Sequence, residues 1–101
     1  EHPIYTALPQ VGAAIAAGNS VILKPSELAP YTSNVLAKYS NNILTQVNHF
    51  YLEYFRCVQG KVQVARAITQ LPFDTICFTG STTTGRLVAI EAAKNLTPCL
   101  L

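Results

Sequence analysis

The chain has 101 residues, of which 50% are hydrophobic and 12% are charged, and its formal net charge is +2. This length allows one domain at most, and the high hydrophobic fraction excludes an intrinsically disordered chain. The positive charge is small and scattered, so no nucleic-acid partner is expected. No apolar run approaches the ~18 residues of a membrane-spanning helix, and no secretory signal is visible, so we expect no membrane segment in these residues.

The first half of the sequence predicts two helices around a buried strand. A short alanine-rich helix is expected over 9–17, because a proline suits its first turn and Gly18 suits its end. The apolar run 21–23 has no polar alternation, which is typical of a parallel strand covered on both faces. Pro25 ends that strand. A second helix is expected over 30 to about 45, where apolar residues recur at helical spacing.

The second half predicts a regular alternation of strands and helices. Strands are expected over 54–58, 75–79 and from 98 onward, with helices over 61–71 and 83–94 between them. Strands separated by helices of this length indicate right-handed crossovers and a parallel sheet. The expected fold class is therefore α/β, a partial Rossmann-like doubly wound parallel sheet with about four strands alternating with helices.

The cysteines Cys57, Cys77 and Cys99 are odd in number and form no C-x-x-C motif. They predict neither a disulfide framework nor a zinc site, so no metal is expected. Each falls in a predicted strand among apolar neighbours. We therefore expect three small buried side chains in a reducing compartment, which is consistent with a cytoplasmic location.

The two ends of the sequence lack the usual features of a complete chain. The sequence begins with Glu1, contains no methionine and stops inside the apolar run 96–101. Domains usually end in polar, exposed residues. We therefore expect a part of a longer chain, and a short sheet with uncovered apolar edges would make this part marginally stable or prone to aggregation.

Residues 80–85 connect a predicted strand to a predicted helix, a position at which open α/β sheets bind ligands. Gly80 would let the backbone approach an anion, and the helix N-terminus offers free N–H groups with a partial positive charge. Alternatively, Ser81 or Thr82 only caps the helix. The loop alone supports the two interpretations equally.

The same loop departs from both standard glycine motifs. It lacks the middle glycine of G-x-G-x-x-G, and after its G-x4-G spacing Arg86 and Leu87 replace the lysine and hydroxyl residue of a P-loop. Leu87 cannot bind Mg²⁺. An ATPase or GTPase is therefore not expected.

Lys24 and Glu27 form a second candidate site, directly after the predicted strand 21–23. A carboxylate there can accept hydrogen bonds from ribose hydroxyls, and an ammonium can donate to a ribose or a 2′-phosphate. Glu27 would repel a 2′-phosphate whereas Lys24 would attract one, so NAD and NADP both remain open. Considered alone, the pair is better explained as a surface ion pair worth ~0–1 kcal/mol.

Two longer motifs resemble the aldehyde dehydrogenase superfamily. They are AAGNSVILKPSE at 16–27 and FTGSTTTG at 78–85, in the family's order and near its spacing. KPSEL at 24–28, FDTICF at 73–78 and AAKNLTP at 92–98 are similar to its class 3 branch. The resemblance covers nearly the whole chain.

The resemblance implies an oxidoreductase that converts a small-molecule aldehyde to a carboxylic acid with NAD or NADP. Residues 1–101 would be part of its dinucleotide-binding domain, with the catalytic domain absent. By the resemblance, Lys24 and Glu27 would hold the adenosine ribose, and Gly80 and Ser81 would approach the pyrophosphate. Gly60 would leave room near the adenine. Dimers are common in the resembled class, so a homodimeric parent enzyme is expected.

The departures from the family concern catalysis. None of the three cysteines matches the family's nucleophile, and its general-base glutamate would follow Leu101. Glu1 stands where the family has its oxyanion asparagine, and a carboxylate cannot donate to an oxyanion. Residues 39–55 contain an apparent insertion, and His2 and His49 lack the spacing for metal or triad chemistry.

The resemblance therefore implies no catalytic residue in the chain, which we expect to be inactive alone. Two alternatives remain open. One is a non-catalytic dinucleotide-binding module or degenerate paralogue, and the other is a purely structural piece without a ligand.

Overall fold

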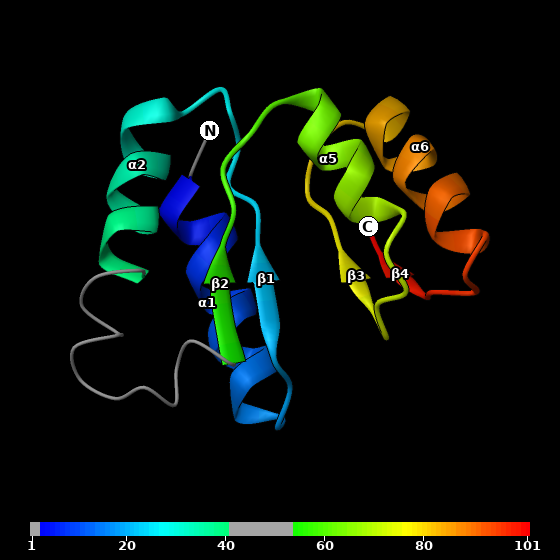
Figure 1. Ribbon diagram of the computed structural model, residues 1–101, viewed down its shortest axis with the longest axis horizontal. Coiled ribbons are helices and arrows are strands. Elements are labelled where there is room, and N and C mark those ends of the chain that lie inside the picture. The colour runs from blue at the N-terminus through cyan, green and yellow to red at the C-terminus, as the bar shows by residue number, and fades with distance from the viewer. Residues whose placement is uncertain (1–2, 41–53) are drawn as a thin grey trace. The chain divides into compact units, whose positions relative to one another are not determined.

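The computed structural model describes residues 3–40 and 54–101. The chain divides into two compact units, Glu1–Lys61 and Val62–Leu101. Each unit is a small α/β assembly that contains one pair of parallel strands (Figure 1). Their hydrogen bonds define two separate two-stranded sheets.

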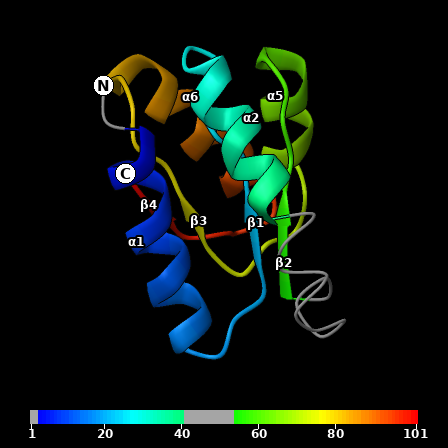
Figure 2. The same ribbon diagram turned by 90° about the vertical axis from the view of Figure 1, so that its left-hand side faces the viewer.

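Over residues 3–40 and 54–61, the first unit contains two helices and two strands. These are α1 (Pro3–Ala16), β1 (Val21–Leu23), α2 (Pro30–Lys38) and β2 (Phe55–Cys57). The strands pair in parallel, with Val21 opposite Phe55 and Leu23 opposite Cys57. Helix α1 runs alongside this pair and contacts both β1 and α2 (Figures 1 and 2). The core is small and is formed by the buried side chains of Ala7, Leu36, Ala37 and Phe55.

Helix α1 begins at Pro3, so the predicted start at Pro9 is wrong. Pro9 lies inside the helix, where it lacks the N–H that would bond one turn back. The exposed position of its ring and the helix-forming alanines that follow let the helix continue through it. Helix α2 ends at Lys38, and Tyr39 and Ser40 continue it as a π-helical turn. The rest of the expected continuation, over 41–45, falls outside the described residues.

Gly18 ends α1, as the sequence predicts. Its φ of +88° lies in the left-handed region. The N–H of Gly18 donates to the Ile15 carbonyl at 2.9 Å, and the N–H of Asn19 donates to the Ala14 carbonyl at 3.0 Å. This pair of bonds is a Schellman motif, which turns the chain away from the helix and into β1.

The second unit repeats the alternation. Its elements are α5 (Val62–Thr69), β3 (Ile76–Cys77), α6 (Thr82–Ala93) and β4 (Cys99–Leu100). Ile76 lies opposite Cys99 and Cys77 opposite Leu100 in a parallel pair. Helices α5 and α6 pack side by side (Figure 1). Gly85, Val88 and Ala92 are buried at helical spacing on α6, which gives this helix its inward face.

Helix α6 ends in the same motif as α1, but with a leucine in the glycine position. Leu96 has a φ of 56°. Its N–H donates to Ala93 at 3.0 Å, and the N–H of Thr97 donates to Ala92 at 3.0 Å. A left-handed conformation costs an L-residue roughly 1–2 kcal/mol. The end of α6 is therefore a locally strained turn.

The fold class of the sequence prediction is confirmed at the level of a mixed α/β chain with short parallel strands. Strand β1 has the predicted bounds. The other three strands lie within the predicted segments but are shorter, with β3 and β4 of only two residues each. The expected helices 61–71 and 83–94 appear as Val62–Thr69 and Thr82–Ala93. The single doubly wound sheet of four strands stays a prediction.

The expectation of three buried cysteines is wrong for Cys77. Its side chain is exposed on β3, whereas Cys57 and Cys99 are half-buried, and all three thiols are free. A strand of two residues in a two-stranded sheet offers little cover for its outer face. Other large side chains are exposed in the same way, including Tyr5, Leu28, Tyr31, Val62 and Leu100.

Some sequence predictions concern residues outside the described ranges. These are the roles given to Glu1, His2 and His49 and most of the apparent insertion at 39–55.

Candidate functional site

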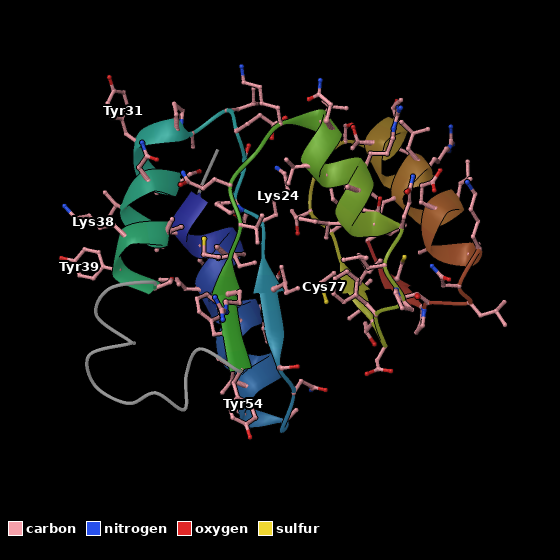
Figure 3. All side chains as sticks on the ribbon, in the orientation of Figure 1. Lys24, Tyr31, Lys38, Tyr39, Tyr54 and Cys77 are labelled. Atoms are coloured by element: carbon pink, nitrogen blue, oxygen red, sulfur yellow. The ribbon has the colours of Figure 1, made fainter. Side chains whose placement is uncertain are left out.

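Lys24 and Glu27 form an ion pair at the carboxyl end of β1. The Lys24 Nζ lies 3.2 Å from Glu27 Oε2, and it also donates to the Pro25 carbonyl at 3.3 Å. The side chains of Lys24 and Glu27 are 15% and 34% exposed, so the lysine side chain is largely covered while the glutamate side chain is more open to solvent. Figure 3 shows Lys24 beside the end of the strand. The pair is therefore held locally and within reach of a ligand.

The turn that carries this pair is fixed to helix α2. The hydroxyl of Ser33, a residue that is only 4% exposed, donates to the Ser26 carbonyl at 2.8 Å. The Ser26 hydroxyl accepts the Leu28 N–H at 3.2 Å, and the Ala29 N–H donates to the Ser26 carbonyl at 3.2 Å. This part-buried hydrogen bond resists movement of the turn, because breaking it would leave the buried Ser33 hydroxyl unsatisfied.

The surroundings of Glu27 lower the pKa of its carboxyl group from the ordinary value of 4.5. Hydrogen bonding to its own backbone contributes most, followed by the hydrogen bond from Lys24 and that residue's charge. Lys61 adds a smaller electrostatic contribution, and burial acts in the opposite direction. Glu27 is therefore an ionised hydrogen-bond acceptor at neutral pH.

Gly60 lies at the same edge of the first unit as the ion pair. The Val58 N–H donates to the Leu23 carbonyl at 2.8 Å, which continues the parallel pairing past β1 and β2. The segments that follow the two strands therefore leave the sheet side by side. The Gln59 amide also donates to Asn34 of α2 at 2.8 Å. Lys24, Glu27 and Gly60 therefore all follow the carboxyl ends of two paired parallel strands.

Ser81 caps the N-terminus of α6. Its hydroxyl oxygen accepts the Thr84 N–H at 3.2 Å, and the hydroxyl donates to Thr84 Oγ1 at 3.0 Å. The backbone of Ser81 is extended, as an N-cap residue requires. The capping interpretation of this loop is therefore confirmed. Anion binding by the same turn is compatible with it, because the other N–H groups at the helix start remain free of helical partners.

Sequence reasoning missed the position of Phe78, which precedes this turn. A Cβ atom built on Gly80 would lie 2.5 Å from Cζ of the Phe78 ring, and one built on Gly85 would lie 3.8 Å from the same ring. The ring therefore packs against both glycines. An aromatic residue two positions before a glycine was the only signal in the sequence, and it does not reveal the ring's direction.

The five predicted site residues belong to different units. Lys24, Glu27 and Gly60 lie in Glu1–Lys61, and Gly80 and Ser81 lie in Val62–Leu101. Each group is a well-formed local structure. A single site made by both groups stays a prediction.

The remaining chemistry-bearing residues form no further cluster in the described chain. Burial raises the pKa of the Cys57 thiol. Over 3–40 and 54–101, no three His, Cys, Asp or Glu side chains gather in a group that could hold a metal ion. No helix in these ranges has both the length and the apolar character needed to cross a membrane.

Comparison with known families identifies the class of protein to which these segments belong. The aldehyde dehydrogenase family model matches residues 1–101. The chain therefore belongs to the aldehyde dehydrogenase family, a family of oxidoreductase enzymes.

Individual relatives agree with this assignment. A 4,4′-diapolycopene-4,4′-dial dehydrogenase of Cytobacillus firmus is 43% identical over 99% of this chain and 21% of its own length. A fatty aldehyde dehydrogenase of Saccharomyces cerevisiae is 42% identical over 98% of this chain and 18% of its own length. Aldehyde dehydrogenase family 3 member A2 of Pongo abelii is 40% identical over 97% of this chain and 19% of its own length. The family 3 name confirms the class 3 resemblance.

A solved structure is similar in fold as well as in sequence. The substrate-bound state of Staphylococcus aureus AldH matches with a TM-score of 0.76 and 36% identity, over 90% of this chain and 18% of that chain. The 101 residues therefore span about a fifth of the relatives that they match.

Proposed function

We propose that this chain forms part of the dinucleotide-binding domain of an aldehyde dehydrogenase, which oxidises a small-molecule aldehyde to a carboxylic acid with NAD or NADP. The observation that carries the proposal is the Lys24–Glu27 ion pair, fixed by the Ser33 hydrogen bond at the carboxyl edge of two parallel strands. Ligands of open α/β sheets bind at this edge. Family membership supports the same assignment.

In this proposal, the first unit binds the adenosine half of the cofactor. The Glu27 carboxylate accepts hydrogen bonds from ribose hydroxyls, and Lys24 donates to the ribose oxygens. Gly60 leaves space for the adenine ring at the neighbouring strand end. The lowered pKa of Glu27 favours this role, because an ionised carboxylate is a stronger acceptor than a carboxylic acid.

The second unit receives the pyrophosphate in the same proposal. Gly80 and Ser81 begin helix α6, whose N-terminus carries a partial positive charge. We infer that β1, β2, β3 and β4 belong to one partial Rossmann-like parallel sheet in the whole enzyme. The ends of all four strands would then face a single dinucleotide.

The ion pair also bears on the choice between NAD and NADP. A 2′-phosphate on the ribose would approach Glu27, which is ionised, and would compete with it for Lys24. NAD requires no such displacement. We therefore infer that NAD binds more tightly than NADP. Glu27→Gln should reduce the difference between the affinities for NAD and NADP.

The chain's own residues do not supply the chemical step in this proposal. A cysteine nucleophile needs a lowered pKa, and burial shifts the pKa of Cys57 the other way. Cys77 and Cys99 lie in strands β3 and β4. By the resemblance, neither of them matches the family's nucleophile. We infer that the chain alone does not oxidise aldehydes. By the resemblance, the parent enzyme would be a homodimer, and we infer a cytoplasmic location from the unpaired cysteines.

Calorimetric titration of the chain with NAD tests the proposal. Lys24→Gln and Glu27→Gln should each weaken binding about tenfold or more, because each removes a charged hydrogen bond. Another Lys–Glu pair, Lys94 and Glu91 at 3.1 Å at the C-terminal end of α6, has the same spacing and provides the matched control. Lys94→Gln and Glu91→Gln should leave the affinity unchanged. No saturable binding would contradict the proposal and favour a structural piece without a ligand.

A further inference from the structure

The ring of Phe78 occupies the space in which a side chain at position 80 would lie. A Cβ on Gly80 would be 2.5 Å from Cζ, 3.0 Å from Cε1 and 3.4 Å from Cε2 of that ring. Real Cβ atoms essentially never approach another heavy atom within 3.0 Å. No residue larger than glycine therefore fits at position 80 unless the ring or the turn moves.

Gly80 is required for space rather than for backbone conformation. Gly18 offers the contrast, since its φ is +88° and a Cβ there would meet nothing within 4 Å. The φ of Gly80 is not in the left-handed region, so an alanine would suffer no strain in the backbone itself. The obstacle at position 80 is the Phe78 side chain.

Phe78 is held at its backbone and at its ring. The Phe78 N–H donates to the Leu100 carbonyl at 2.9 Å, which fixes its backbone beside β4. On the helix side, the ring lies against buried Gly85 in the first turns of α6, at ordinary van der Waals distance from a built Cβ. The half-buried ring therefore connects the end of β3 to the start of α6.

We propose that Phe78 is a positioning residue for the cofactor turn, because its ring, seated against Gly80 and Gly85, sets the direction of the first turn of α6 and of Ser81. This inference rests on the proposed function for the identity of the ligand. According to this inference, position 80 is a glycine because the Phe78 ring, which supports the turn, fills the space that a side chain would need. Close approach of a phosphate would be a separate reason for glycine, and the two reasons predict different results for substitutions.

A double-mutant cycle in the full chain distinguishes the two reasons. Phe78→Leu removes Cζ and both Cε atoms, which are the three atoms nearest to a Cβ at position 80. Gly80→Ala should therefore raise the Kd for NAD at least about fivefold in the chain that keeps Phe78. In the Phe78→Leu variant, the same substitution should raise the Kd by less than about twofold. The Kd values are measured under conditions in which circular dichroism shows that each variant is folded. Gly12→Ala is the control, because a Cβ there meets nothing within 4 Å.

Stability provides the second arm of the experiment. The urea midpoints of the four proteins should be non-additive, with Gly80→Ala less harmful after Phe78→Leu. If Gly80→Ala alone does not fold, recovery of a folded double variant is the same rescue. Equal weakening of NAD binding by Gly80→Ala in both backgrounds would overturn the positioning role.

The same cycle separates failure of the inference from failure of the proposed function. Absence of NAD binding by the unsubstituted chain overturns the proposed function, and the positioning role with it. In that case, non-additive urea midpoints would still show that the Phe78 ring packs against Gly80 and stabilises the turn. Additive midpoints would show that this contact is absent.

Discussion

Replacing Ser81 separates its role as a helix cap from its role toward an anionic ligand. The hydroxyl oxygen accepts the Thr84 N–H at 3.2 Å, so Ser81→Ala removes the cap of α6 and should cost about 1 kcal/mol. For a chain of this length that loss lowers Tm by roughly 4–8 °C. Ser81→Asp keeps an acceptor and adds a negative charge at the positive end of the helix, worth about 0.3–1 kcal/mol. Its stability should equal or exceed that of the unsubstituted chain.

The effect of Ser81→Asp on binding should be the opposite. At about 4 Å, an added carboxylate repels a phosphate charge by roughly 1–4 kcal/mol between bulk-water and protein-surface screening. The Kd for NAD should therefore rise at least about fivefold, even though the protein is no less stable. Thermal unfolding followed by circular dichroism and calorimetric titration measure the two quantities separately.

A control must place the same charge elsewhere in the second unit. The Gln70 carbonyl accepts a hydrogen bond from Asn95, beyond the C-terminal end of α6, so Gln70 lies about one helix length, roughly 18 Å, from Ser81. Gln70→Glu should leave the NAD affinity unchanged. If Ser81→Asp binds NAD as tightly as the unsubstituted chain, the turn does not meet the phosphates. If it unfolds as early as Ser81→Ala, the cap geometry is wrong.

Three further predictions concern stability, pH and activity. Leu96→Gly should stabilise the chain by about 0.5–1 kcal/mol in urea unfolding, because glycine relieves the left-handed strain at a side chain that is 90% exposed. Leu28→Gly is the control, because Leu28 is 89% exposed but does not have a positive φ, and this substitution should lower the stability of the chain. If both substitutions lower the stability equally, Leu96 is not strained. The folded pKa of Glu27 is lowered, so the stability that it contributes is present above about pH 4.5 and is lost as the pH falls through the folded value. Urea midpoints of Glu27→Gln should show less loss on acidification, and an unchanged acid profile would count against the pair. The purified chain should produce no NADH from NAD and an aldehyde, and any aldehyde-dependent production would show that a nucleophile is present.

The elements best predicted from the sequence are those bounded by strong local signals. Gly18 and Pro25 lie on either side of β1. Gly18 adopts the left-handed φ that ends α1, and the strand ends before Pro25, which cannot donate a backbone hydrogen bond. Helix α6 was predicted to within one residue because a hydroxyl residue precedes it and its apolar positions recur at helical spacing. The start of α1 was missed because Pro9 is equally compatible with a first turn and with a tolerated position inside a helix.

The candidate site was predictable where it depends on local spacing. Lys24 and Glu27 are three residues apart, and the structure forms the ion pair that this spacing allows. The contact between Phe78 and Gly80 was not predictable, because it depends on the direction of one aromatic ring rather than on a pattern. The exposure of Cys77 was missed for a related reason, since an apolar run cannot show how many strands will cover it.

One measurement tests whether both units serve one cofactor. Amide signals of the isotope-labelled chain are followed by nuclear magnetic resonance during titration with NAD. The account predicts that the signals of Lys24 and Glu27 shift together with those of Gly80 and Ser81, all with the same dissociation constant. Shifts confined to one of the two units, or no saturable shift at all, would contradict the claim that these residues bind a single dinucleotide.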